Sequence, residues 1–103
     1  MMFQDCRVGD TIYIFDRSTI CLTTKDVVRV SAPYPDRSNI VVDVSVDKFT
    51  TYVFKTSDKI GYCGELAISA DKSALMRVVE AHMASKERQV SKLKEIIEQL
   101  NEE

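Results

Sequence analysis

The residues after Gly64 include neither glycine nor proline, and this feature most constrains how the chain can fold. Most of them are good helix formers. Apolar side chains recur there with gaps of alternately three and four residues, the spacing of the a and d positions of a heptad repeat. These positions are Met76, Val79, Met83, Lys86, Val90, Leu93, Ile97 and Leu100, and only Lys86 is polar. The pattern predicts one long coiled-coil helix over residues 69–103, with Ser69 as its N-cap.

A helix of this length cannot lie entirely against a small domain, because it extends about 1.5 Å per residue. Leu75, Val78 and His82 widen its apolar face near the start, so its first turns are suited to dock on the rest of the chain. Little protein is left to cover residues 86–100, and an isolated helix is marginal in water. We therefore expect the eight heptad positions to join copies of the chain into a dimer or other small oligomer. Packing within one chain and binding to a different protein are the alternatives.

The residue types at the heptad positions also bear on how two helices would pair. From Val90 onward, β-branched residues at a and leucine at d favour two parallel strands. Lys86 places a charge in the middle of the apolar row, which lowers stability and restricts the register.

Residues 1–68 show a different pattern, in which short apolar runs alternate with turn residues. This is typical of a small antiparallel sheet. Five strands are predicted, over residues 11–15, 20–31, 40–46, 49–55 and a kinked stretch 60–68. Pro33 and Pro35 predict a loop, because proline cannot donate to a sheet ladder. The acidic residues change from mostly Asp to mostly Glu near residue 69, which indicates a boundary between a β-domain (1–68) and the helix (69–103).

The opening stretch RVGDTIYIF, a long second strand and a tight hairpin before the last strand resemble the SH3-like layout of KOW and Tudor modules. The resemblance implies an α+β protein: a small five-stranded antiparallel barrel of SH3-like or OB-like type, followed by the coiled-coil helix. The chain departs from ligand-binding Tudor and SH3 domains, since it has no tryptophan and no evident aromatic cage. A small barrel followed by a long helix also resembles many short phage proteins.

The hairpin over residues 40–55 predicts a contact surface. A tight turn at Asp47-Lys48 would set Val42 opposite Val53, with both side chains in the core. Val41, Tyr52 and Phe54 would then point outward together, and either the chain's own helix or N-terminus covers them or a partner does. Lysine is disfavoured at positive φ, so a register that differs by one residue is left open.

No catalytic, metal or cofactor site is predicted. Cys6, Cys21 and Cys63 form no CxxC motif, and His82 is the only histidine, whereas a zinc site needs four ligands. No motif links Cys63 to His82, so a structural thiol is the expected role of this cysteine. The stretch from Gly61 to Gly64 has the GxxG spacing of a KH loop, but it lies between strand-like segments and lacks basic residues.

The formal net charge of −2 is spread evenly, so no basic block indicates nucleic-acid binding. Some cationic and aromatic side chains could still form a stacking groove. They are Arg7, Arg17, Arg29 and Arg37, with Tyr13, Phe15 and Tyr34. Aspartates occur among these residues in the same loops, which favours charged turns in contact with solvent over a stacking groove. No run is long and apolar enough for a membrane span or a signal peptide, so a cytoplasmic protein is expected, with association with a virus particle left open.

Together these patterns predict a non-enzymatic binding or structural accessory protein. The β-domain would present a contact surface to another protein, and the helix would supply two or more copies of it. A nucleic-acid-binding small barrel is the alternative.

Overall fold

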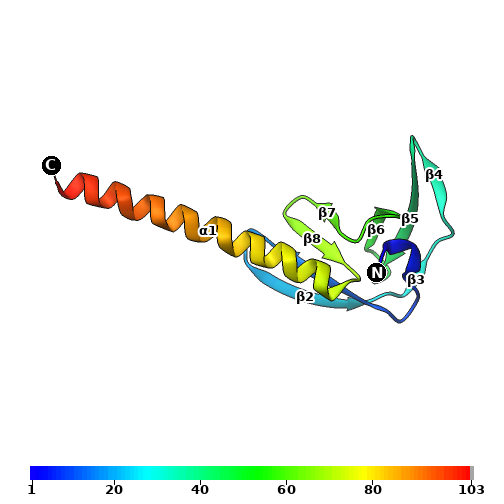
Figure 1. Cartoon of the computed structure of the whole chain (residues 1–103). Coiled ribbons are helices and arrows are strands. Elements are labelled where there is room, and N and C mark those ends of the chain that lie inside the picture. The colour runs from blue at the N-terminus through cyan, green and yellow to red at the C-terminus, as the bar shows by residue number, and fades with distance from the viewer. Residues whose placement is uncertain (103) are drawn as a thin grey trace.

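This computed structural model describes residues 1–102 of the chain, which contain eight short strands, one 3-10 turn and one long helix (Figure 1). In chain order the elements are the 3-10 turn η1 (Phe3–Asp5), β1 (Thr11–Asp16), β2 (Cys21–Asp26), β3 (Arg29–Val30), β4 (Tyr34–Asp36), β5 (Asn39–Ser45), β6 (Thr51–Lys55), β7 (Gly61–Cys63), β8 (Leu66–Ser69) and α1 (Lys72–Asn101). The prediction of an α+β chain with antiparallel strands and one C-terminal helix is confirmed.

The first sheet has the strand order β2-β1-β8-β7, and both of its faces are covered at β1. Side chains alternate along this strand, so Ile12 and Ile14 point into the main core while Phe15 points to the other side. Phe15 packs there with Ala67 of β8 and Leu75 of α1. The helix therefore lies over the outer face of this sheet.

The second sheet is built around β5. Strands β3 and β4 pair with successive halves of one edge of β5, and β6 pairs with its other edge. Val42 and Val44 of β5 and Phe54 of β6 face the main core. The ring of Phe54 stacks on that of Phe3, with centroids 3.8 Å apart. Gly61 lies against the same ring, where an added Cβ would come within 2.2 Å of it, so no side chain fits at this position.

The predicted five-stranded barrel is not what the strands form, because neither sheet closes and the strands number eight within residues 1–102. The stretch 20–31 is not one strand. It changes sheets after Asp26. The Val27 amide donates to the carbonyl of Asp10, just before β1, and the Val28 amide donates to the carbonyl of Ser45 in the second sheet. The predicted proline loop contains β4, and this strand tolerates Pro35 because it lies at a sheet edge.

The β5–β6 hairpin has a register one residue away from the predicted tight turn. Val42 pairs with Phe54 rather than with Val53. The connection is longer than two residues because the Asp47 carboxylate accepts hydrogen bonds from the amides of Phe49 (2.8 Å) and Thr50 (2.7 Å). The Asp47 side chain thus stabilises a longer turn. The predicted two-residue turn would have placed Lys48 at positive φ, which lysine disfavours.

The helix begins two residues later than its predicted cap implies. Ser69 is the last residue of β8, paired with Tyr13, and Asp71 is the N-cap. The helix continues to Asn101, and Glu103, at the end of the predicted segment, lies outside the described residues. Because α1 projects beyond the strands (Figure 1), the extents of the chain are 63 × 29 × 24 Å.

Candidate functional site

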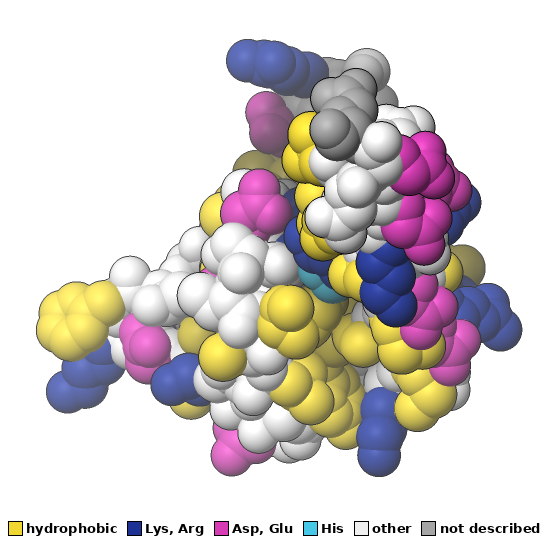
Figure 2. Space-filling view, turned by 90° about the vertical axis from the view of Figure 1, so that its left-hand side faces the viewer, with side chains coloured by type: hydrophobic (Ala, Val, Ile, Leu, Met, Phe, Trp, Pro, Cys, Tyr) yellow, Lys and Arg dark blue, Asp and Glu magenta, His cyan; other side chains and the backbone are white. Residues whose placement is uncertain are grey.

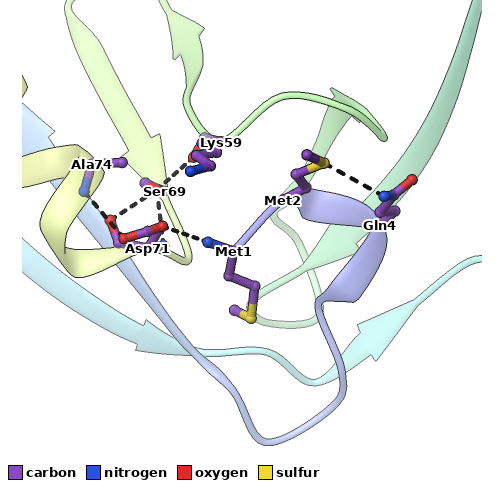
Figure 3. A network of polar contacts seen from close by, with 7 residues as sticks. All are labelled: Met1, Met2, Gln4, Lys59, Ser69, Asp71 and Ala74. Carbon is purple, nitrogen blue, oxygen red and sulfur yellow. Dashed lines mark hydrogen bonds and ion pairs between the residues drawn. The ribbon is translucent and has the colours of Figure 1, made fainter.

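A small polar network fixes the start of α1 (Figure 3). The Asp71 carboxylate accepts a hydrogen bond from the Ala74 amide at 3.1 Å and forms an ion pair with the α-ammonium of Met1. The Ser69 hydroxyl donates to the Lys59 carbonyl at 2.5 Å and accepts from the Asp71 amide at 2.9 Å. The network ties the first residue, the end of β8 and the first helical turn together. It therefore sets the direction in which the helix leaves the domain.

The charge of Asp71 is stabilised by this arrangement. Its hydrogen bond with the Met1 ammonium, together with that from the Ala74 amide, lowers the pKa of the Asp71 carboxyl to about 2, and the positive charge of Lys59 acts in the same direction. An ionised carboxylate at this position also interacts favourably with the positive end of the helix dipole.

Only the first half of α1 is docked on the β-domain. Leu75 is buried against Phe15 and Ala67, and Val78 packs on the same cluster one turn later. His82 meets the Phe15 ring edge-on, with centroids 5.6 Å apart. Ser85 is the last partly covered residue, and every described side chain after it is exposed. The helix thus continues for residues 86–101, roughly 24 Å, without any cover from the described part of its own chain.

The apolar heptad side chains predicted for oligomerisation form an uncovered row along α1, here called the seam. Its apolar members are between 37% and 66% exposed. They are Met76, Val79, Met83, Val90, Leu93, Ile97 and Leu100, with the exposed Lys86 among them. Figure 2 looks towards the molecule from the C-terminal end of the helix and shows hydrophobic side chains along α1 and on the adjoining domain surface.

The seam continues onto the β-domain as an apolar groove. Met76 and Val79 form one wall of this groove, and Tyr13 of β1 and Leu22 of β2 form the other. The hollow measures about 190 Å³, with Leu75 and Lys72 completing its lining. Leu22 is an exposed leucine on an outer strand, so the domain adds its own apolar side chain to the surface that the helix presents.

The predicted contact surface of Val41, Tyr52 and Phe54 does not exist as one outward face. Because the hairpin register differs by one residue, Phe54 lies in the main core and Tyr52 packs against it. Val41 is on the other face of β5 and is buried as well. Its cross-strand neighbour Tyr34 donates a hydrogen bond to Asp43 at 2.6 Å on that face.

The cationic and aromatic residues of the predicted stacking groove are dispersed. Phe15 is buried beneath α1 and offers no ring to a ligand. Arg37 lies in the β4–β5 turn, far from the β1–β2 turn that carries Arg17 (Figure 1). Arg7 donates to the backbone carbonyls of Gln4 and Cys6. These four arginines therefore do not line one groove, and nucleic-acid binding stays an untested prediction.

Cysteine and histidine side chains do not gather. Cys6 is buried, which raises the pKa of its thiol, and Cys21 and Cys63 are exposed on separate strands. Within residues 1–102 no three His, Cys, Asp or Glu side chains lie close enough together to hold a metal ion. In the same part of the chain, no helix has the combined length and apolar character that crossing a bilayer requires.

Comparison of the chain with protein-family models, curated proteins and solved structures finds no match.

The heptad spacing identified the helical part of the candidate site, but it could not identify the groove. Tyr13 lies beside the seam because α1 docks on β1 and β8, and Leu22 lies there because β2 pairs with β1. Both are long-range contacts without a local signal. Ile96, a further exposed apolar residue beside the seam, was not among the predicted positions. Its place next to Ile97 in the sequence was the available signal.

Proposed function

We propose that this chain is a non-enzymatic, self-associating accessory protein in which α1 joins two copies along the seam. The observation that carries the proposal is the uncovered apolar row on the half of α1 that projects beyond the β-domain. An isolated helical segment of that length is marginal in water, so a partner that buries the seam would stabilise it. A second copy supplies a matching apolar row.

The exposed area of the single chain supports the same proposal. The accessible surface is 7322 Å². A compact monomer of 11.7 kDa would expose roughly 5,900 Å². The excess is roughly 1,400 Å², whereas each partner in a standard protein–protein interface buries about 800 Å². The projecting helix thus leaves enough surplus surface for a stable interface between copies.

Self-association would join two β-domains into one bivalent molecule. Two domains on one rod can engage two sites at once, and joined weak contacts gain avidity without any new interaction. The resemblances to SH3-like modules and to short phage proteins stay predictions. Within this proposal they favour an accessory role in a larger assembly, with the β-domain as the part that contacts another protein.

Sedimentation equilibrium of the full chain tests the proposal. At micromolar concentration the wild type is expected to have a mass above 11.7 kDa. Leu93→Glu with Leu100→Glu places two charges in the seam and should return the mass to that of the monomer, because burying unpaired carboxylates is costly.

The matched control is Ser91→Glu with Gln99→Glu. It adds the same charge at two exposed positions of the same helix that lie outside the seam. This variant should remain oligomeric. A wild type that is monomeric at the highest soluble concentration would overturn the proposal, as would equal dissociation of both double variants.

A further inference from the structure

A second hollow lies on the other flank of α1. Its helical wall includes Ala74, Arg77 and Ala81, which at about 100° per residue project roughly a third to half a turn away from Met76 and Met83. The opposite wall comes from the β1–β2 turn and from the segment that enters β7. The hollow, here called the basic cleft, measures about 570 Å³, and its lining includes Arg17, Lys59, Ile60, Tyr62, Arg77 and Val78.

The charge of the basic cleft is opposite in sign to that of the whole chain. Its lining includes Arg17, Lys59 and Arg77 and no carboxylate, although the chain carries a formal net charge of −2. Within residues 1–102 none of these three cations forms an ion pair, and the nearby Asp71 is engaged by the Met1 ammonium. The lining of the cleft thus holds three cations and no carboxylate, which favours an anionic ligand.

Arg17 is held in place before any ligand arrives. Its Nε donates to the Glu65 carbonyl at 3.1 Å and one terminal nitrogen, Nη2, donates to the Gly64 carbonyl at 2.8 Å. Gly64 has a φ of +58°, a conformation that glycine adopts without strain, and this turn presents the two carbonyls to the guanidinium. The Nη1 group has no partner among the described residues and can donate to a ligand. Such preorganisation lowers the entropy lost on binding.

The remaining lining is suited to a flat apolar group. Tyr62 is exposed, and the Arg17 guanidinium lies 5.2 Å from the centre of its ring, in cation–π contact. Ile60 and Val78 are partly buried and belong to the cluster beneath the helix, so they offer a fixed apolar floor. An apolar surface with a few convergent charged groups, at this volume, is typical of small-molecule sites.

The geometry points to a binding site for a small aromatic anion in the basic cleft. Its phosphate or carboxylate group lies among Arg17, Lys59 and Arg77, and its ring packs against Tyr62 and the Ile60–Val78 floor. The site is on the flank away from the seam, so ligand binding and self-association are separate properties. A chain that does not bind the ligand can still self-associate, and a monomeric chain can still bind the ligand.

Titration of the full-length chain, followed by amide NMR shifts, tests the site. Adenosine monophosphate probes the phosphate form of the ligand and benzoate the carboxylate form, while adenosine supplies a ring without an anion. At least one of the two anions should bind saturably and shift amides at residues 59–62 and 74–82, and adenosine should not. Binding should weaken with added salt, because partly exposed charges are screened.

Arg77→Gln is the decisive variant, since its side chain makes no hydrogen bond or ion pair within residues 1–102 whose loss could disturb the fold. It should weaken binding about tenfold, the effect expected on losing one charge-assisted hydrogen bond. Arg88→Gln removes the same charge from the same helix outside the basic cleft and should leave the affinity unchanged. Tyr62→Leu should weaken binding of the ring-bearing anions and leave inorganic phosphate unaffected.

Three outcomes would overturn the assignment. They are the absence of saturable shifts for both anions, equal weakening by Arg77→Gln and Arg88→Gln, and binding of single-stranded oligonucleotides with none of the mononucleotide or benzoate. The last result would replace the small-molecule site with a nucleic-acid surface.

Discussion

Two phenylalanines of the β5–β6 hairpin have opposite surroundings. Phe54 is 6% exposed and stacks on Phe3, whereas Phe49 in the connecting loop is 96% exposed. Phe54→Ser should cost about 3–5 kcal/mol of unfolding free energy, because it leaves a cavity in the main core. Phe49→Ser should change it by less than about 0.5 kcal/mol. Urea denaturation of both variants measures the difference. A larger loss of unfolding free energy for Phe49→Ser than for Phe54→Ser would support the tight-turn register instead.

The ion pair between Met1 and Asp71 predicts a pH dependence of stability. The pKa of Asp71 falls to about 2 in the folded chain. A free aspartate has a pKa of about 3.9. A lowered folded-state pKa contributes stability that is fully present above the unfolded value and is lost as the pH falls from about 4 to 2.

Asp71→Asn keeps a capping oxygen and removes the charge, so its melting temperature should fall less steeply than that of the wild type over this range. Thermal melts between pH 6 and pH 2 make the comparison. Parallel curves for the two proteins would show that the charge of Asp71 does not act on stability.

At the residue scale the sequence predicted that Val42 and Val44 of β5 face the core, but neither the burial of Val41 nor the way in which β6 pairs with β5. Alternation along a strand has a period of two and identifies Val42 and Val44 as one face, and both are in the core. The same alternation says nothing about the length of the connection. That length depends on Asp47 accepting two amide hydrogen bonds, and a shift of one residue sends Tyr52 and Phe54 to the opposite face.

The helix is the element that the sequence described best. The heptad spacing placed the seam on one exposed row and the docked residues Leu75, Val78 and His82 on another. The start was misplaced because Ser69 and Asp71 are both good caps by residue type. The choice between them depends on Ser69 pairing with Tyr13 as part of β8, which no local pattern shows.

Lys86 is the element's weakest position if the seam pairs as proposed. An ammonium buried without a partner costs free energy, whereas an aliphatic side chain fits an apolar row. Lys86→Leu should therefore raise the melting temperature of the oligomer. Circular dichroism at fixed concentration measures the change. A lower melting temperature would mean that Lys86 is paired with an acid or lies outside the interface.

The charges at the two ends of α1 bear on the orientation of a pair. The first turns carry Lys72 and Arg77 without an acid, and the last turns carry Glu95, Glu98 and Glu102 without a base. This is the reverse of what the helix dipole favours. An antiparallel copy would bring acids to the cationic end and would separate the two Lys86 side chains. A parallel copy would join like charges at both ends.

We therefore expect antiparallel pairing, although side-chain shape from Val90 onward favours the parallel form. In a Cys21→Ser, Cys63→Ser background, Leu100→Cys alone should not form an intermolecular disulfide. Adding Met76→Cys should allow one, because full antiparallel overlap sets Leu100 opposite Met76 of the second copy. Rapid crosslinking of Leu100→Cys by itself would show parallel helices and leave self-association intact.

At the scale of the whole molecule the chain is far from compact. Its radius of gyration is 18.0 Å. A globular domain of this length would have about 13 Å. The sequence predicted a projecting helix, but not the two-sheet arrangement beneath it. This arrangement depends on contacts between segments distant in the sequence, such as the pairing of Ile14 with Ile68 and the change of sheet at Val27-Val28. Short-range sequence patterns do not predict such contacts.

The helix content of the whole chain should depend on protein concentration. Residues 86–101 have no cover from the rest of residues 1–102, so on dilution below the dissociation constant of the pair they should lose much of their helicity. Far-ultraviolet circular dichroism across a hundredfold dilution measures the loss. The Leu93→Glu, Leu100→Glu variant should show the lower helicity at every concentration, and a dilution-independent wild type would contradict the prediction.

The polar network at Asp71 gives the uncovered half of α1 a further consequence. The network and the contacts of Leu75 and Val78 anchor the first turns whether or not a second chain is present, so unravelling would begin at the far end and stop near Ser85. A chain without its copy would then expose a flexible tail to cellular proteases, while paired chains would be protected. Turnover would depend on abundance: scarce chains would be degraded quickly, and chains produced beyond a threshold would persist.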